Sequence, residues 1–473
     1  MNYYFLGIGG IGMSALARYF RQNGDRVSGY DRVATPLTHA LEQEGIEVHY
    51  EDRPDLLPED IDIAVYTPAI PHQLGEFVAL RDKGVCMKKR AQVLGELTKG
   101  KKCIAVAGSH GKTTTTTLIA HLLNSVGCGC SAFLGGISKN FDSNLVVDRE
   151  GQYVVVEADE YDRSFLQLSP YYAVITSTDP DHLDIYGTHE QLLDAYAQFA
   201  NKVPPDGRLF LKQGTFLKAD GESYIETGHH HHHDHEDHGS GHGVELEPSM
   251  STYTAHGVDA DYYAVNVRTY GGNLFFDLRT PQGVFYDLEL CGTALFNVEN
   301  AVAASAVALT CGLDQYQLRS GLRSFAGVRR RFDYRIREKN LVYIDDYAHH
   351  PAEIRSTIES VRYLYPGKRL VGIFQPHLYT RTRDLADQFA EVLQGLDEVV
   401  MLPIYPAREL PIPGVTSSMV LRKIPGMSKY LCTPDQVLDL VPALCPDVVL
   451  TLGAGNIDQL VPRLETTLRE QLL

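Results

Sequence analysis

The sequence lacks several features, and each absence excludes a class of protein. Its eight cysteines include no C-x-x-C pair and no framework spacing, so we expect reduced thiols. Basic residues are in deficit, 43 against 60 acidic ones, and the net charge of −17 argues against nucleic-acid binding. No uncharged stretch reaches membrane-spanning length, and the run from Tyr3 to Ala17 lacks the basic start of a signal peptide. We therefore expect a cytoplasmic protein without membrane insertion.

Length and the order of elements predict three α/β domains. At 473 residues the chain is too long for one hydrophobic core, and about 150 residues per domain is usual. Strand-like and helix-like segments alternate, which is typical of open sheets with sites at the carboxyl ends of their strands. A polar linker after Leu97 and a change of pattern near Gly327 suggest the boundaries. We expect domains at residues 1–98, 99–326 and 327–473.

The segment from Lys101 to Gly127 is the centre of the sequence, because it predicts a phosphate-binding loop. An apolar strand ends at Ala107, a glycine-rich turn follows, and a helical pattern begins at Thr113. Backbone N–H groups bind phosphate in such a turn, lysine reaches the terminal phosphates, and the threonine hydroxyl holds magnesium. The usual spacing would put the first glycine at Val106, so only the Gly-Lys-Thr half of the common motif is matched. The predicted nucleotide-binding residues are Gly108, Ser109, His110, Gly111, Lys112, Thr113 and Thr114.

Acidic residues after the next buried strand predict a metal site beside this loop. The β-branched strand that begins at Tyr153 runs into Glu157 and three further carboxylates within six residues. An acid at a strand tip beside a phosphate-binding loop can hold magnesium directly or through water. The following strand precedes Asp181 and His182, and His182 is the candidate ligand of a second cation. A purely structural histidine is the alternative.

A second glycine-rich turn lies near the N-terminus. A strand over Tyr3–Leu6 leads into Gly7–Ser14, and the acid Asp31 ends the next strand, about twenty residues after the glycines. This G-x-G-x-x-G fingerprint indicates a diphosphate at a helix N-terminus without specifying the nucleotide. A structural glycine turn is the alternative. The helix after the turn is expected from Ala15 to Gln22.

The later part of the middle domain carries weaker signals. Residues 229–242 (HHHHHDHEDHGSGH) are interpreted as an exposed insert without catalytic role, whose histidines can bind zinc or nickel weakly. Alternating segments within residues 262–290 predict antiparallel strands. Asn297 and Asn300 precede a helix expected over residues 301–309, and both amides can hydrogen-bond an adenine edge. Helix capping is the alternative role for Asn297.

Polar clusters in the last domain follow predicted strands. An arginine-rich segment, Val328–Asp333, comes first, and later clusters are Asp345–Pro351, Gln375–Arg383 and Gly453–Asn456. The carboxyl ends of parallel strands meet at one edge of a sheet. We therefore expect these clusters to form one site.

Taken together, these motifs resemble the Mur ligase family, and within it the members that attach L-alanine to UDP-N-acetylmuramate. The resemblance covers nearly the whole chain, and the order and spacing of its motifs are highly specific. It rests on Gly7–Ser14 (GIGGIGMS), Gly108–Thr114 (GSHGKTT), Glu157–Asp162 (EADEYD), the pair Asp181-His182, Arg330-Arg331-Phe332, Asp345–Pro351 (DDYAHHP) and Phe374–His377 (FQPH).

The resemblance implies an architecture and a reaction. A Rossmann-like domain binds the UDP-sugar, a central P-loop domain binds ATP, and a C-terminal Rossmann-like domain binds the amino acid. The lactyl carboxylate attacks the γ-phosphate of ATP, and the amine of L-alanine then attacks the acyl phosphate and expels phosphate. Both steps gather negative charge, so cations and oriented N–H donors are needed. The expected cofactors are ATP and Mg²⁺ at two sites, in a monomer or weak homodimer.

The resemblance also implies a role for each matching residue. Lys112, His349, Arg330 and Arg381 are expected to be catalytic. His349 is the preferred base for the alanine ammonium, because an imidazole titrates near neutral pH. Metal is expected at Thr113, Glu157 and His182, and ATP at Gly108 to Thr114 together with Asn297, Asn300 and Arg330. The UDP-sugar is expected at Gly9, Gly10, Ile11, Gly12, Met13, Ser14, Asp31, Thr67, Pro68, Ala69 and Ile70. The amino acid is expected at Tyr347, His349, His350 and Arg381.

The chain departs from the family pattern at three places. Ligases that add later residues carry a carbamylated lysine after the Asp-His motif, whereas Phe199 and Ala200 stand there, as is usual for alanine-adding members. Phe296 replaces a histidine that often precedes the first adenine-binding asparagine, although an aromatic ring can still stack on a base. Leu378 occupies a position where many relatives carry arginine.

Three alternative functions compete with this interpretation. The recycling ligase of the same family attaches a whole peptide, but its N-terminal glycine segment usually differs from the one found here. A nicotinamide-dependent dehydrogenase would leave Lys112 and Glu157 unexplained. A non-catalytic UDP-sugar sensor would not need Lys112, Glu157, His182 and His349 together.

Overall fold

A computed structural model describes residues 1–179, 186–215, 217, 248–426 and 428–473. The tract 229–242 and the pair Asp181-His182 lie outside the described residues. The chain divides into two compact units. The first comprises Met1–Asn266, Phe276–Leu288 and Glu299–Ala326, and the second comprises Val267–Phe275, Glu289–Val298 and Gly327–Leu473.

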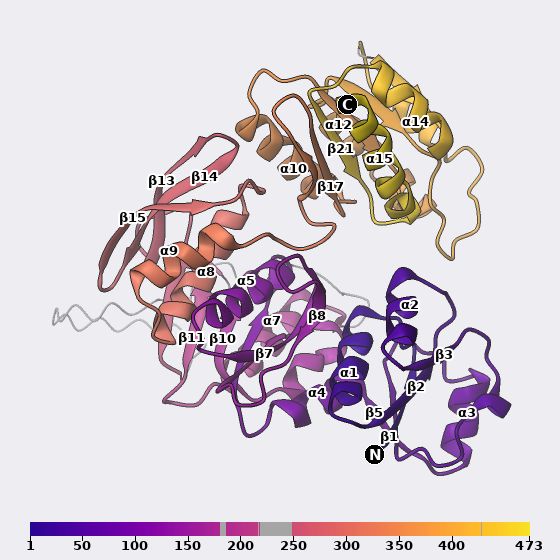
Figure 1. The fold of residues 1–473 in the computed structure, drawn as a ribbon, viewed down its shortest axis with the longest axis vertical. Coiled ribbons are helices and arrows are strands. Elements are labelled where there is room, and N and C mark those ends of the chain that lie inside the picture. The colour runs from indigo at the N-terminus through magenta and orange to yellow at the C-terminus, as the bar shows by residue number, and fades with distance from the viewer. Residues whose placement is uncertain (180–185, 216, 218–247, 427) are drawn as a thin grey trace. The chain divides into compact units, whose positions relative to one another are not determined.

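The N-terminal region, indigo in Figure 1, forms an open parallel sheet. Its strand order is β3-β2-β1-β4-β5. Every residue of β1 is buried, as expected for a strand covered on both faces. The chain direction across the sheet reverses between β1 and β4, and ligands bind at such switch points. The elements are β1 Asn2–Leu6, α1 Ile11–Gln22, β2 Arg26–Tyr30, α2 Pro36–Gln43, β3 Glu47–His49, η1 Pro54–Leu56, β4 Ile63–Tyr66, α3 Gly75–Asp82, β5 Cys86–Lys89 and α4 Arg90–Thr98.

The middle region is built on a ten-stranded sheet of order β15-β14-β13-β12-β11-β10-β6-β9-β7-β8. Strand β6 lies between β9 and β10 and runs parallel to both. The elements are β6 Lys102–Ala107, α5 Lys112–Ser125, β7 Cys130–Ser138, β8 Ser143–Val146, β9 Tyr153–Glu157, η2 Tyr161–Gln167, β10 Pro170–Ile175, α7 His189–Ala200, β11 Arg208–Lys212, β12 Met250–Thr254, β13 Tyr262–Tyr270, β14 Asn273–Thr280, β15 Gly283–Leu290, α8 Asn297–Thr310 and α9 Gln315–Ser324.

Two predictions for this region can be compared with the structure. The strands expected within residues 262–290 are present as the neighbours β13, β14 and β15. Their connections are too short for a crossover, so consecutive strands are antiparallel. Helix α8, in contrast, begins at Asn297 instead of residue 301.

Helix α1 packs on strands of the middle region and joins the two sheets of the first unit. The rings of Tyr19 on α1 and Phe133 on β7 lie 5.5 Å apart. Buried residues from both regions, including Phe20 and Val156, form one hydrophobic cluster. The N-terminal and middle regions therefore share a core.

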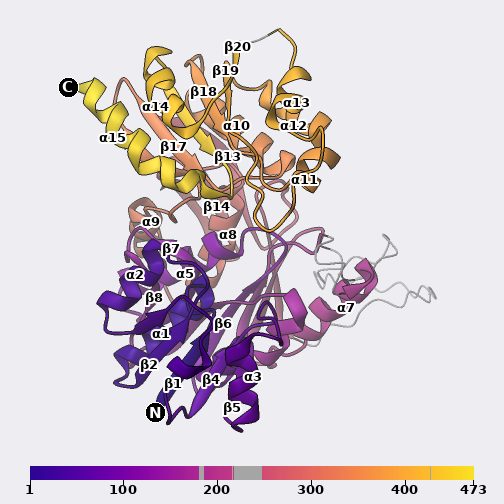
Figure 2. The same cartoon turned by 90° about the vertical axis from the view of Figure 1, so that its right-hand side faces the viewer.

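The C-terminal region is a six-stranded sheet of order β16-β17-β21-β18-β19-β20, in which only the β16–β17 pair is antiparallel. Helices α14 and α15 cover one face, and α12 and α13 lie on the other (Figure 2). The elements are β16 Asp333–Arg337, β17 Val342–Asp346, α10 Pro351–Leu364, β18 Leu370–Phe374, α11 Tyr379–Asp384, α12 Ala386–Leu393, β19 Glu398–Met401, α13 Ser417–Arg422, β20 Ser428–Leu431, α14 Pro434–Ala443, β21 Val448–Leu452, η3 Asn456–Gln459 and α15 Leu460–Leu472.

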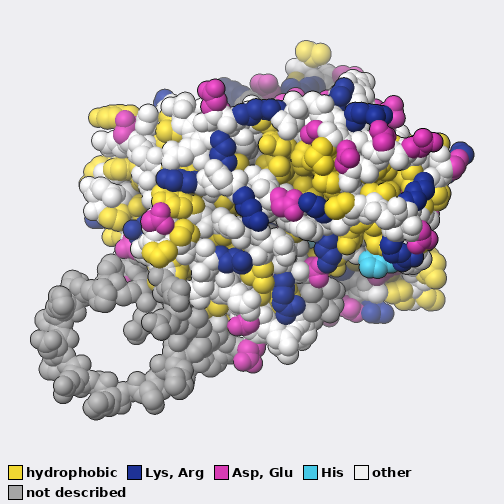
Figure 3. Space-filling view, turned by 90° about the horizontal axis from the view of Figure 1, so that it is seen from below, with side chains coloured by type: hydrophobic (Ala, Val, Ile, Leu, Met, Phe, Trp, Pro, Cys, Tyr) yellow, Lys and Arg dark blue, Asp and Glu magenta, His cyan; other side chains and the backbone are white. Residues whose placement is uncertain are grey.

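The surface mixes charges of both signs. On the face shown in Figure 3, lysine and arginine side chains are interspersed with aspartate and glutamate. Among the described residues, no helix is both long enough and apolar enough to cross a membrane.

Candidate active site

The residues for which the sequence predicts a phosphate-binding loop form the turn between β6 and α5. Gly111 caps α5 in the left-handed conformation, with φ 82°, and Gly108 has φ 141°. A Cβ on Gly108 would lie 1.8 Å from Oγ1 of Thr176, and one on Gly111 would lie 2.6 Å from Oδ1 of Asn300. Conformation and space both require glycine here. The turn thereby brings backbone N–H groups to the N-terminus of α5.

Residues that follow β10 hold this turn in place. The Ser109 N–H donates to Oγ of Ser177 at 3.1 Å, and the Ser109 hydroxyl donates to the carbonyl of Asp179 at 2.8 Å. The Thr176 hydroxyl donates to the carbonyl of His110. These hydrogen bonds therefore fix the shape of the loop against the segment that follows β10.

The first two side chains of α5 meet the acidic segment after β9. Nζ of Lys112 lies 2.7 Å from Oε2 of Glu160, and the Thr113 hydroxyl donates to Oε1 of Glu157 at 3.0 Å. Burial disfavours the ammonium of Lys112, but the attraction of Glu160 and Asp159 outweighs it, so the pKa of Lys112 is raised. Lys112 is therefore charged at neutral pH.

Thr113 and Glu157 have the chemistry of magnesium ligands. Mg²⁺ prefers oxygen ligands and usually keeps several waters, so a hydroxyl and a carboxylate beside phosphate suit it. Gly135 on β7 leaves room for the carboxylate, because a Cβ there would lie 1.8 Å from Oε2 of Glu157. His182, the expected ligand of a second cation, lies outside the described residues.

The two candidate adenine-binding amides lie on α8. Asn300 is buried beside Gly111, so its amide is next to the phosphate-binding loop. Asn297 is also buried, and its Nδ2 donates to the hydroxyl of Thr293 at 2.8 Å. The preceding Phe296 has an exposed ring.

Asp31 binds the N-terminal glycine turn directly. The Gly9 N–H donates to Oδ2 of Asp31 at 2.8 Å, whereas the acid of a dinucleotide fingerprint contacts a ribose hydroxyl. Helix α1 begins at Ile11, so the expected start at Ala15 was wrong. Glycine is a poor helix former, and Gly12 therefore weakened the helical pattern in the first turn.

The Thr67–Ile70 turn lies beside the same glycine segment. It follows β4, and its ends are joined by a hydrogen bond from the Ile70 N–H to the Thr67 carbonyl at 3.1 Å. Cδ1 of Ile70 lies 3.2 Å from where a Cβ on Gly7 would be. The structure also places the Arg90 side chain 3.2 Å from the Cβ position of Gly12. The two segments expected to receive the UDP-sugar thus meet at the switch point, with a cation that the sequence did not single out.

In the second unit, Arg330 is fixed at the edge of the six-stranded sheet. Its Nε and Nη2 donate to the carboxylate of Asp345 at 2.9 and 3.0 Å, and Nη1 donates to the Gly453 carbonyl at 2.9 Å. Burial opposes the charge of the guanidinium, but the bonds to Asp345 outweigh it, and the pKa of Arg330 is raised. The bonds to Asp345 and Gly453 use three of the five guanidinium N–H groups and leave two for other acceptors.

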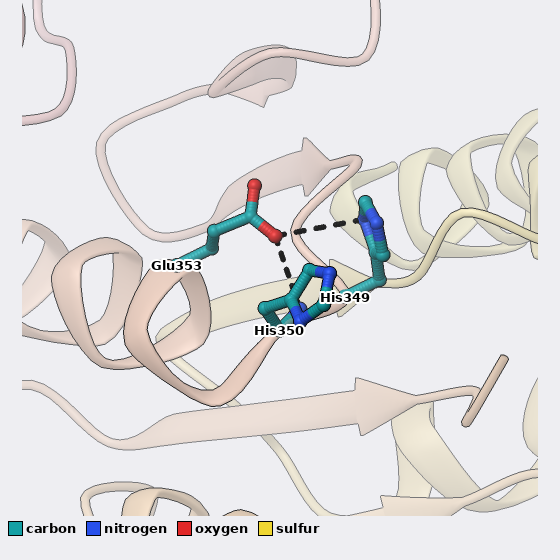
Figure 4. Close-up of side chains that lie close together, drawn as sticks. All are labelled: His349, His350 and Glu353. Carbon is teal, nitrogen blue, oxygen red and sulfur yellow. Dashed lines mark hydrogen bonds and ion pairs between the residues drawn. The ribbon is translucent and has the colours of Figure 1, made fainter. Parts of the chain in front are cut away.

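The two histidines of the DDYAHHP segment lie between β17 and α10 and face Glu353 (Figure 4). Oε1 of Glu353 accepts from the His350 N–H at 3.0 Å and lies 3.7 Å from Nδ1 of His349. Ligand atoms of the three side chains lie within 4.8 Å of one another. Burial lowers the pKa of His349, so its imidazole is neutral at neutral pH.

Arg381 and His377 lie at the same edge of the sheet. Nη1 of Arg381 donates to Nδ1 of His377 at 3.1 Å, and this requires a neutral His377. Burial and the nearby Arg381 both lower the pKa of His377. Its ring centre lies 6.1 Å from that of His349, whose ring in turn meets Tyr347 at 5.2 Å. The residues expected to bind the amino acid are therefore brought together within the second unit.

Several polar residues of these sites were not singled out from the sequence. Glu353 follows His350 by three positions at a helix start, which is the spacing of a capping box, so a local signal existed. Glu160 belongs to the recognised acidic run, but nothing local distinguishes it from its neighbours. Arg90 carries no local signal, because its proximity to Gly12 depends on packing between distant segments.

Three sequence models of one family cover most of the chain. The Mur ligase family catalytic domain matches residues 2–102, the middle domain matches 106–308, and the glutamate ligase domain matches 330–455. The chain belongs to the Mur ligase family. Its three-domain α/β architecture, expected from the sequence, is confirmed.

Curated Mur ligases resemble the chain over nearly its full length. A UDP-N-acetylmuramate–L-alanine ligase of Parabacteroides distasonis is 46% identical over 475 residues, covering 99% of this chain and 97% of the relative. One of Porphyromonas gingivalis strain W83 is 46% identical, covering 97% of both chains.

Solved structures of Mur ligases have the same fold. A UDP-N-acetylmuramate–alanine ligase of Thermotoga maritima has a TM-score of 0.83 at 27% identity and covers both chains completely. A murein peptide ligase of Psychrobacter arcticus has a TM-score of 0.67 at 22% identity, covering 99% of this chain and 98% of that one.

Proposed function

We propose that this protein uses ATP to join L-alanine to the lactyl carboxylate of UDP-N-acetylmuramate. The products are UDP-N-acetylmuramoyl-L-alanine, ADP and phosphate, and the reaction serves the synthesis of peptidoglycan precursors. The observation that carries this proposal is the 46% identity with a curated ligase of this activity over 99% of the chain.

Each region of the chain takes one substrate in this proposal. Residues 1–98 bind the UDP-sugar, residues 99–326 bind ATP, and residues 327–473 bind L-alanine. The Gly9–Ser14 turn, with Thr67 to Ile70, receives the diphosphate, because the start of α1 offers N–H groups and Arg90 lies beside it.

The first step activates the lactyl carboxylate, which by itself is a poor acyl donor. The carboxylate attacks the γ-phosphate of ATP, and the acyl phosphate that results carries phosphate as a leaving group. The N–H groups of Gly108 to Thr114 orient the phosphates, and the charged Lys112 stabilises the negative charge gathering on the transferred group. Asn297 and Asn300 contact the adenine.

Thr113 and Glu157 would hold Mg²⁺, with His182 at a second ion, and the ions would neutralise charge on the phosphates. The hydrogen bond between Thr113 and Glu157 supports this assignment, because it keeps both oxygens together beside the loop.

The second step forms the amide. L-alanine must lose a proton before its amine attacks the acyl phosphate, and the neutral imidazole of His349 accepts that proton. Tyr347, His350 and Arg381 position the amino acid. Arg330, held in one orientation by Asp345, offers its two remaining N–H groups to the negative charge of the tetrahedral intermediate.

The experiment that tests the proposal is phosphate release from ATP with UDP-N-acetylmuramate and one amine at a time. Release that requires both the sugar and L-alanine is expected, with none for D-alanine, and Lys112→Ala should abolish it. Release only with a tripeptide would assign the protein to peptide recycling instead. UDP-sugar binding without release for any amine would refute catalysis. Gel filtration with light scattering tests the accompanying expectation of a monomer or weak homodimer, and cell fractionation tests that of a cytoplasmic location.

A further inference from the structure

Glu160 is a buried carboxylate at the phosphate-binding loop to which the proposed reaction assigns no role. Its residue is 0% exposed, and its Oε2 lies 2.7 Å from Nζ of Lys112. Burying a carboxylate far from water is costly unless a cation compensates it. Lys112 is that cation, so the two side chains depend on each other.

The main chain of Glu160 is fixed from two sides. Its carbonyl accepts from the hydroxyl of Tyr186 and, at 3.0 Å, from the N–H of Arg163. The guanidinium of Arg163 lies 4.7 Å from the centre of the Tyr186 ring, and Tyr186 is buried. The carboxylate therefore extends from a rigid base rather than from a free loop.

An ammonium group can serve Glu160 and a phosphate at the same time. Lysine carries three N–H donors, and the bond to Glu160 uses one of them. A lysine side chain is flexible and loses considerable rotamer freedom when it is held in one place. A fixed carboxylate that holds the ammonium before the nucleotide arrives reduces the conformational entropy that the lysine side chain loses on binding.

We propose that Glu160 is the positioning residue of Lys112, holding its ammonium ready for the terminal phosphates of ATP and keeping that position while they are bound. This inference rests on the proposed function of the loop and adds a residue to it. Glu160 acts through Lys112 and does not touch the nucleotide.

A double-mutant cycle on nucleotide affinity tests this role. The chain has no tryptophan, so a nucleotide with a fluorescent N-methylanthraniloyl label reports ATP binding without interference from that residue. Affinity is measured for the wild type, Glu160→Gln, Lys112→Met and the double variant. Glu160→Gln should weaken binding about tenfold in the wild type. It should not weaken binding in the Lys112→Met background, where there is no ammonium to hold.

Turnover provides the second readout. Glu160→Gln should lower kcat for phosphate release about 10- to 100-fold, because Lys112 is then misplaced in the transition state. Asp162→Asn is the matched control, since it removes a charge from the same segment but its partner is Lys89, at 3.2 Å. It should not weaken nucleotide binding.

Three results would overturn the proposal. They are equal weakening by Glu160→Gln in both backgrounds, no weakening in the wild type, or the same loss in Asp162→Asn. If Glu160→Gln fails to fold, Glu160→Asp replaces it, because aspartate keeps the charge but has a shorter side chain. Nucleotide affinity and kcat equal to those of the wild type in Glu160→Asp would then refute the role. Nucleotide binding is measured without sugar or alanine, so failure of the alanine-ligase assignment would be seen separately, in the phosphate-release assay.

Discussion

At the scale of single residues, neighbouring side chains of the same type have different partners. Asp345 and Asp346 are both buried, but Asp345 pairs with Arg330, whereas Asp346 accepts from the Ala348 N–H at 2.8 Å and the Thr357 hydroxyl at 3.2 Å. Burial raises the pKa of Asp346 to about 6. The sequence shows two adjacent acids and cannot show this difference, because it is created by strand pairing and helix packing.

The raised pKa predicts how pH changes the contribution of Asp346 to stability. Its unfolded pKa is about 4, so the folded protein favours the protonated acid. The stabilising contribution of the protonated Asp346 to folding is complete below about pH 4, and it is lost as the pH rises through about 6. Asp346→Asn cannot ionise, so the unfolding free energy of the wild type should fall relative to the variant by up to about 3 kcal/mol between about pH 4 and pH 7.

Urea unfolding at several pH values measures this difference. The control is Asp387→Asn, which changes an exposed acid of the same unit and should give a smaller pH-dependent difference. A constant free-energy difference between the wild type and Asp346→Asn across this range would contradict the prediction.

At the scale of elements, local signals in the sequence predicted most helices and strands well. They did not predict how these elements pack against one another. The strand, glycine turn and helix from Lys102 to Ser125 were expected almost as they are found, because alternation of residue types, glycine and helical spacing are local. The start of α1 and the edge strand β16 were missed. The pair of Arg330 with Asp345 also depends on the β16–β17 pairing, which no local pattern reveals.

The contact between α1 and β8 predicts an effect of Asn144 on the proposed UDP-sugar site. Asn144 is fully buried; its Nδ2 donates to the Ile11 carbonyl at 2.8 Å and the Ser14 hydroxyl at 3.0 Å, and its Oδ1 accepts from Arg18 at 2.6 Å. Asn144→Ala leaves the carbonyl and the guanidinium without these bonds. We expect a loss of about 2–4 kcal/mol in unfolding free energy.

UDP-N-acetylmuramate should also bind more weakly to Asn144→Ala, because Ile11 and Ser14 form the first turn of α1. Urea unfolding and titration calorimetry measure the two effects. Asn140→Ala is the control; that side chain is exposed and bonds to the Ser324 carbonyl and the Ala326 N–H, away from α1. Unchanged sugar affinity in Asn144→Ala would show that the network does not support the site.

At the scale of the whole molecule, the chain carries three family domains but two compact units. A polar linker in the sequence suggested a domain boundary near residue 98. A linker does not show whether the regions on either side of it pack against each other. Arg18 and Asn144, on opposite sides of that linker, form a buried hydrogen bond across 126 positions of sequence. The motifs of the sites could be recognised residue by residue, whereas the division into units follows from contacts between distant positions.

This division predicts how the protein unfolds with heat. Residues that share a core unfold together, so the N-terminal and middle regions should give one calorimetric transition and the second unit another. Under the proposed function UDP-N-acetylmuramate binds the folded N-terminal region, and at about 100 times its Kd it should stabilise that unit by about 2.7 kcal/mol. The ligand should therefore move a single transition that includes the phosphate-binding loop and leave the other in place.

Asn144→Ala should split the moved transition in two, because the buried contacts of Asn144 join the N-terminal and middle regions. Three transitions in the wild type, with only the smallest responding to the sugar nucleotide, would instead show that each family domain folds as its own unit.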